Sequence, residues 1–172
     1  MTHSLNSTKS NNYSENATLL DRCHSIIVVS LGFWISTSLL LDLVVMPMLW
    51  ATGMMESSGF ASAGYSLFWV FNRVEVICAA AALSSIWALG TSDGNSVYGS
   101  AKMRVGALML LAISLSYTFI LSPYMSGLSM DLDIFAVAKS IPAEMNQIHS
   151  IYWVLEASKL GIAGMLLAGC DK

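Results

Sequence analysis

Four long apolar stretches dominate the sequence and decide what the chain can fold into. Each is about 22–25 residues long, and a helix of that length, rising about 1.5 Å per residue, crosses the hydrocarbon core of a bilayer. The stretches cover residues 26–50, 65–89, 103–124 and 147–168. Charged residues make up only 11% of the 172-residue chain, against about 25% in a typical soluble domain. We therefore expect an all-α integral membrane protein, a four-helix bundle occupying residues 26–170.

The segment before the first stretch has a different composition. Residues 1–25 are rich in Ser, Asn and Thr and show no apolar periodicity, so they predict a disordered polar tail. Pro47 stands near the end of the first stretch. Because proline removes a backbone donor and clashes with the preceding turn, it predicts a kink or a helix end there.

The basic residues predict which way the bundle faces. An even number of spans places both termini on one side of the membrane. Five basic residues fall on that side and one, Lys139, on the other; the five are Lys9, Arg22, Lys102, Arg104 and Lys172. The positive-inside rule therefore predicts that both termini are cytoplasmic. With a net charge of −3 and no Lys/Arg cluster, nothing indicates a nucleic-acid partner.

Ionisable side chains interrupt three of the four stretches at a similar depth. Counted at about 1.5 Å per residue, Asp42, Arg73 and Glu156 each lie about 12 Å inside the span. Glu75 and Lys159 follow a few residues deeper. An ionised group exposed to hydrocarbon costs at least about 2.5–3.5 kcal/mol. We therefore expect these side chains to point into the bundle and to pair with one another.

Two pairings follow from this arrangement: Asp42 with Arg73 between helices, and Glu156 with Lys159 three residues apart on one helix. Glu75 is then left without a cation, and Asn72 or a backbone carbonyl is its nearest hydrogen-bond partner. A second interpretation stays open. The polar layer could serve only to fix helix packing and register.

A metal site is a further hypothesis. Met145 and His149 are four residues apart on one helix, so their side chains could reach one ion, and thioether and imidazole ligands suit Cu(I). The alternative is that methionine fills gaps between helices and His149 caps a loop. A bis-histidine haem is disfavoured, because His24 and His149 belong to opposite ends of the bundle, about 30 Å apart. No nucleophile–base pair or phosphate-binding loop is present, so we do not expect an enzyme.

Several segments are similar to a known family. The first span ends in VVMPMLW, the connection reads GFASAGY, and FNRVE opens the second span; later segments are SPYM and FAVAKSIPAEMNQIHSIYWVLEASKL. Over roughly residues 26–168 the chain resembles the transmembrane-protein-205-like family of four-helix membrane domains, most closely its branch in oxygenic phototrophic bacteria. The resemblance implies the four-span fold and a plasma or thylakoid membrane. It implies no settled activity and no role for any residue.

Two functions from different classes stay open. The leading one is a non-enzymatic membrane protein whose polar core binds or conducts a small ligand, a proton or a metal ion. The alternative is an interaction or assembly subunit of a larger membrane complex, with photosynthetic complexes as one case. The expected partners are the lipid bilayer and either such a complex or further copies of the chain.

Overall fold

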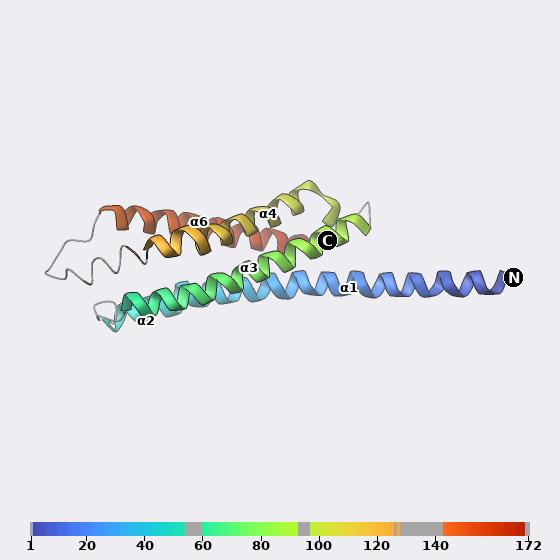
Figure 1. Ribbon diagram of the computed structural model, residues 1–172, viewed down its shortest axis with the longest axis horizontal. Helices are drawn as coiled ribbons and strands as arrows, with labels where there is room; N and C mark the ends of the chain where they lie inside the picture. The colour runs from blue at the N-terminus through green and yellow to red at the C-terminus, as the bar shows by residue number, and fades with distance from the viewer. Residues whose placement is uncertain (1, 54–59, 93–96, 126, 128–142, 171–172) are drawn as a thin grey trace.

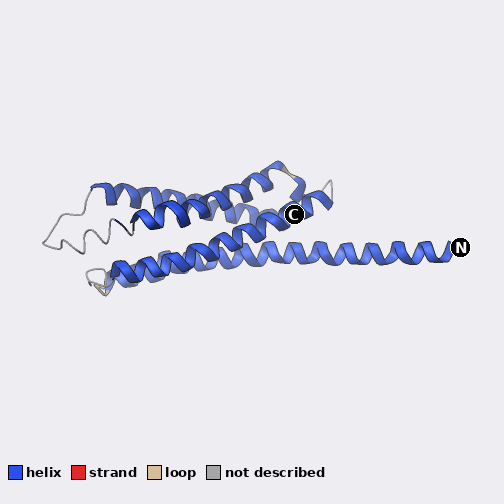
Figure 2. Ribbon diagram, in the orientation of Figure 1, coloured by secondary structure: helices blue, strands red, loops and turns tan. Residues whose placement is uncertain are grey.

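The computed structural model is almost entirely helical over the residues it describes, which are 2–53, 60–92, 97–125, 127 and 143–170 (Figure 2). The elements are α1 (Thr2–Leu40), the π turn η1 (Leu41–Val45), α2 (Met46–Ala51), α3 (Phe60–Ser92), the 3-10 turn η3 (Val97–Gly99), α4 (Ala101–Ser116), the π turn η4 (Tyr117–Leu121) and α6 (Ala143–Cys170). Among these residues, four helical segments are long and apolar enough to cross a membrane. They are Thr18–Leu49, Ala63–Thr91, Ala101–Met125 and Ser150–Cys170. The predicted all-α architecture with four apolar helices is confirmed.

The four segments form a closed ring. α1 packs against α3, α3 against α4, α4 against α6, and α6 returns to α1 (Figure 1). The start of the first segment and the end of the last lie at the same end of the bundle, since His24 Nε2 is 3.3 Å from the carbonyl oxygen of Cys170. Small buried side chains such as Ala79 and Ala82 on α3 let the backbones approach closely.

The N-terminal segment differs from its prediction. Instead of a separate disordered tail over residues 1–25, α1 begins at Thr2 and continues past the ends of the other helices (Figure 1). Starting a helix is the unfavourable step, and adding residues to an existing helix costs little. The apolar span supplies that nucleus. A polar sequence joined to it can therefore continue the helix.

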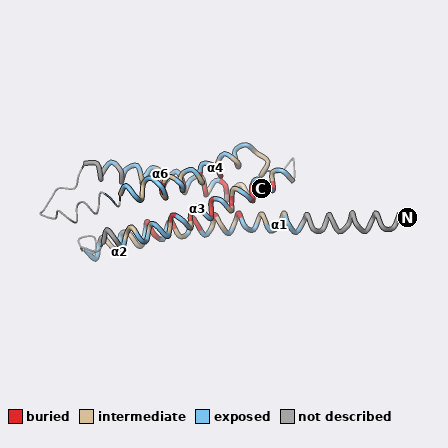
Figure 3. Tube along the Cα trace, in the orientation of Figure 1, coloured by how far each residue is buried: buried red, intermediate tan, exposed pale blue. Residues whose placement is uncertain are grey.

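Figure 3 marks the buried positions along the helices. The interior that these residues fill is divided into an apolar half and a polar half. The apolar half, at the end where His24 meets Cys170, is filled by buried hydrophobic side chains from all four helices: Ile27, Leu31, Trp34, Cys78, Ala79, Ala82, Ile86, Leu89, Met103, Ala107, Leu110, Ala163 and Leu166. The polar half holds most of the buried polar side chains: Ser38, Asp42, Asn72, Glu75, Ser114, Glu156 and Lys159. Ser85 is the exception, a buried polar residue inside the apolar half. On each helix the change occurs within about one turn.

Two π turns shape the polar half, and each ends two residues before a proline. η1 precedes Pro47 and η4 precedes Pro123. In both, the amide just past the turn donates to the carbonyl five residues earlier. Proline supplies no amide proton for the carbonyl four residues before it, and a wider turn accommodates that loss. The predicted break at Pro47 is thus a π turn, after which the chain continues as α2. The turns carry Asp42 and Tyr117, both of which are buried.

Candidate functional site

The centre of the polar half is a buried ammonium group held between two carboxylates. Lys159 Nζ on α6 lies 2.5 Å from Glu75 Oε1 on α3 and 2.8 Å from Glu156 Oε2, one turn earlier on α6. All three side chains are at most 3% exposed. A lysine ammonium carries three donors on a flexible stem, so it can serve two carboxylates at once. We call Asp42, Glu75, Glu156 and Lys159 the ion-pair cluster.

Hydroxyl groups connect the cluster across all four helices. Tyr152 donates to Asp42 Oδ1 at 3.3 Å, and Ser38 donates to Glu75 Oε1 at 3.3 Å. The Tyr117 hydroxyl lies 3.3 Å from Glu156 Oε2 and 3.1 Å from the Tyr152 carbonyl oxygen, either of which can accept its proton. The result is one polar network in which Tyr152 joins Asp42 to the rest of the cluster.

Two aromatic rings enclose the ammonium group. Lys159 Nζ lies 5.9 Å from the centroid of the Trp34 ring and 5.3 Å from that of Tyr117. Both distances are within the range of cation–π attraction. Trp34 and Tyr117 are each 2% exposed, so the rings also keep the ion pairs away from lipid.

The cluster has more acceptors than the described residues satisfy. Asp42 Oδ2, Glu75 Oε2 and Glu156 Oε1 are buried without a hydrogen-bond partner among those residues, and so is the Trp34 indole nitrogen. Lys159 is the one buried cation in the described part of the chain, where three carboxyl groups are buried, and its ion pairs are with Glu75 and Glu156. No three His, Cys, Asp or Glu side chains of that part are grouped as metal ligands. A proton bound to one of the surplus acceptor oxygens would turn it into a donor.

The structure brings together four of the residues that depth alone predicted, but not Arg73. The Glu156–Lys159 pair is confirmed. The Asp42–Arg73 pair is wrong: Arg73 is exposed, and its guanidinium carbon lies 3.9 Å from the centroid of the Trp69 ring. Two helical residues two positions apart point about 200° apart. Since Glu75 faces the interior, Arg73 must face outward.

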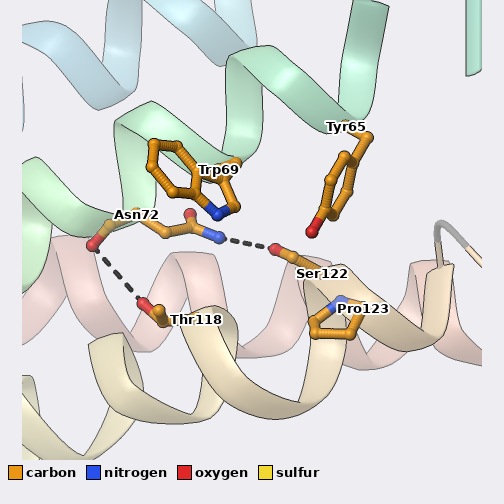
Figure 4. Close-up of a pocket in the computed structure, with 6 residues that line it drawn as sticks. All are labelled: Tyr65, Trp69, Asn72, Thr118, Ser122 and Pro123. Atoms are coloured by element: carbon orange, nitrogen blue, oxygen red, sulfur yellow. Dashed lines mark hydrogen bonds between the residues drawn. The ribbon is translucent and has the colours of Figure 1, made fainter. Parts of the chain in front are cut away.

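Glu75 and Asn72 also have other partners than predicted. Glu75 is paired with Lys159, so the prediction that it lacks a cation is wrong. Asn72 lies outside the cluster, where its Nδ2 donates to Ser122 Oγ at 2.5 Å and its carbonyl accepts from Thr118 Oγ1 at 3.5 Å (Figure 4). These bonds border a pocket of about 10 Å³, roughly the space for one water. Asn72 thus joins α3 to the third span.

The metal hypothesis falls on side chains outside the described part of the structure. This applies to both Met145 and His149, so a copper site there stays a prediction. His24 lies edge-on to Tyr98 with ring centroids 6.3 Å apart. It belongs to the end of the bundle opposite the ion-pair cluster.

Sequence reasoning missed four members of the site, namely Trp34, Ser38, Tyr117 and Tyr152. A positional signal was present for two of them. Ser38 precedes Asp42 by four residues and Tyr152 precedes Glu156 by four, and residues so spaced share a helix face. Tyr117 had no charged neighbour on its own helix to indicate it.

Compared with family models, with curated proteins and with solved structures, the chain matches none. The resemblance to the four-helix family therefore stays a prediction, and the site stands on its own geometry.

Proposed function

We propose that this protein is a multi-pass membrane protein that binds protons in its ion-pair cluster, as a step in proton-coupled transport. One observation carries the proposal. Three buried carboxyl groups accompany one buried ammonium group, which pairs with two of them, and each carboxyl keeps one oxygen without a partner among the described residues.

The physical reason lies in the cost of buried charge. Removing an ion from water costs several kcal/mol unless a partner compensates it. One ammonium group cannot neutralise three carboxylates. A bound proton removes one negative charge and turns an acceptor oxygen into a donor. A proton bound to one of these three carboxyl groups would therefore let its vacant oxygen donate a hydrogen bond.

The two halves of the bundle support access to the cluster from one side. The polar network reaches toward the bundle end that carries α2, while the apolar half closes the route toward His24 and Cys170. Such an arrangement suits a state in which the cluster exchanges protons only with the side of the membrane at the α2 end. Release to the other side would require the apolar half to rearrange.

The orientation belongs to the same proposal. Arg22, Lys102 and Arg104 all lie at the apolar end of the bundle. By the positive-inside rule this end is cytoplasmic, so the cluster faces the opposite side of a plasma or thylakoid membrane.

The experiment is an infrared titration of the purified protein in lipid, following the C=O stretch of protonated carboxyl groups. We expect a hydrogen–deuterium-sensitive band from a buried carboxylic acid that disappears at alkaline pH and is reduced by Glu156→Gln and by Asp42→Asn. The matched control is Asp21→Asn, which removes an exposed carboxyl group from α1. A wild-type protein without a buried carboxylic acid band, or an equal loss in the control, would contradict proton binding.

A second measurement distinguishes binding from transport. Liposomes with a trapped pH-sensitive dye report proton flux under an imposed pH gradient. Transport predicts wild-type flux that Glu156→Gln abolishes and Asp21→Asn leaves intact. A titrating band without flux would restrict the function to proton binding.

The alternative function, an interaction or assembly subunit, rests on the outward face of the third span. Large apolar side chains are exposed there: Val105, Leu108, Met109, Leu115, Phe119 and Ile120. A partner helix would cover this face. Mild-detergent purification from native membranes would then give a large particle that Phe119→Ala shrinks and Glu156→Gln leaves unchanged.

A further inference from the structure

A groove of about 420 Å³ lies between α4 and α6, in the apolar half and away from the ion-pair cluster. This volume is within the range of about 300–1,000 Å³ of small-molecule sites. Its walls are apolar apart from one lysine, Lys102. The apolar residues that line it include Val105, Met109 and Met165.

The shape of the groove follows from a close approach of the two helices. Gly106 has no side chain, and a Cβ there would lie 3.0 Å from Leu166 Cδ2. The helices therefore touch at the floor of the groove. Longer side chains stand on both sides of this contact: Val105 is 53% exposed, Met109 52% and Met165 71%.

The lysine is at one end of the groove. Lys102 is the second residue of α4, at the start of the third membrane-spanning segment, and it is exposed. From there the groove runs down to Met109, about 10 Å deeper at the helical rise. The end at the membrane boundary is cationic and the part inside the bilayer is apolar. Basic pockets between spans are known to hold anionic lipid head groups.

We propose that this groove binds an anionic phospholipid, with its phosphate at Lys102 and an acyl chain between α4 and α6. Charge complementarity selects the anionic head group, and the apolar depth of the groove requires a chain attached to it. Free phosphate would satisfy only Lys102. A zwitterionic lipid would bring a second, positive charge to the same place.

Native mass spectrometry of the full chain tests this. The protein is released from micelles containing phosphatidylglycerol or phosphatidylcholine with identical acyl chains. We expect phosphatidylglycerol to be retained preferentially and Lys102→Gln to weaken its retention about fivefold, the effect of one lysine at a membrane surface. The matched control is Arg22→Gln, which removes one charge from α1 at the same end of the bundle, outside the groove.

A second variant tests the apolar part. Met165→Trp adds bulk at an exposed wall position and should lower retention of both lipids while the melting temperature is unchanged. Equal retention of the two lipids by the wild type would overturn the proposal, and so would equal effects of Lys102→Gln and Arg22→Gln. A dimer that excludes lipid would show that a second copy occupies the groove instead.

Discussion

Replacing Lys159 by methionine is the sharpest test of how the bundle is held together. Methionine keeps most of the aliphatic stem but removes the ammonium group that lies 2.5 Å from Glu75 and 2.8 Å from Glu156. Breaking a buried ion pair by removing one partner typically costs about 3–5 kcal/mol. We expect the free energy of unfolding of Lys159→Met to fall by at least this amount, because two carboxylates lose their cation.

The triple variant Glu75→Gln/Glu156→Gln/Lys159→Met separates charge from shape. It leaves none of the three charges behind, and neutral replacements of buried ion pairs are often close to neutral in stability. We therefore expect it to recover most of the loss.

The assay is reversible unfolding in mixed micelles with increasing SDS, followed by circular dichroism. Arg22→Met, at an exposed arginine of α1, is the matched control and should stay within about 0.5 kcal/mol of wild type. If Lys159→Met costs no more than this control, or if the triple variant is no more stable than the single one, the ion pairs do not hold the bundle.

Three further predictions concern single positions. Gly90→Ala should lower the free energy of unfolding by about 1–3 kcal/mol, because the added Cβ would lie 2.8 Å from a carbonyl oxygen of η3. Gly32→Ala is its control: the added Cβ meets nothing within 4 Å, so this variant should raise the free energy of unfolding by up to about 1 kcal/mol. Arg73→Gln should change stability by about 1 kcal/mol or less, since this side chain only covers a tryptophan; a loss as large as that of a cluster variant would disprove its outward position. Pro47→Ala restores a backbone amide and should remove the π turn η1. A double-mutant cycle should then show a weaker coupling energy between Asp42 and Tyr152 than in the wild type. An unchanged coupling energy would refute the link between the proline and the turn.

The sequence predicts the spans well because the bilayer imposes both their length and their composition. Each of the four predicted spans, residues 26–50, 65–89, 103–124 and 147–168, coincides with a helical segment long and apolar enough to cross a membrane. The first helix differs from its prediction, because α1 begins at Thr2, well before residue 26. Local composition describes what a residue prefers in isolation, whereas a helix already formed lowers the cost of extending it.

The site was predicted in part, since position along a helix gives depth but not direction. Arg73 and Glu75 have similar depths and opposite directions, so only one of them could join the cluster. Tyr117 could not be found from its own helix, because its partners are on α6. The prolines after both π turns were visible in the sequence, but which residue a π turn directs inward depends on the neighbouring helices.

The apolar half of the bundle has an electrical consequence. Water-free hydrocarbon carries most of the voltage across a membrane, and a unit charge crossing the whole field gains or loses about 2.3 kcal/mol per 100 mV. A proton reaching the cluster through the polar half would traverse only the part of that field that lies before the cluster. The remaining drop would fall across the packed apolar segment between Lys159 and the far end of α6. Loading would then depend less on voltage than release through that segment.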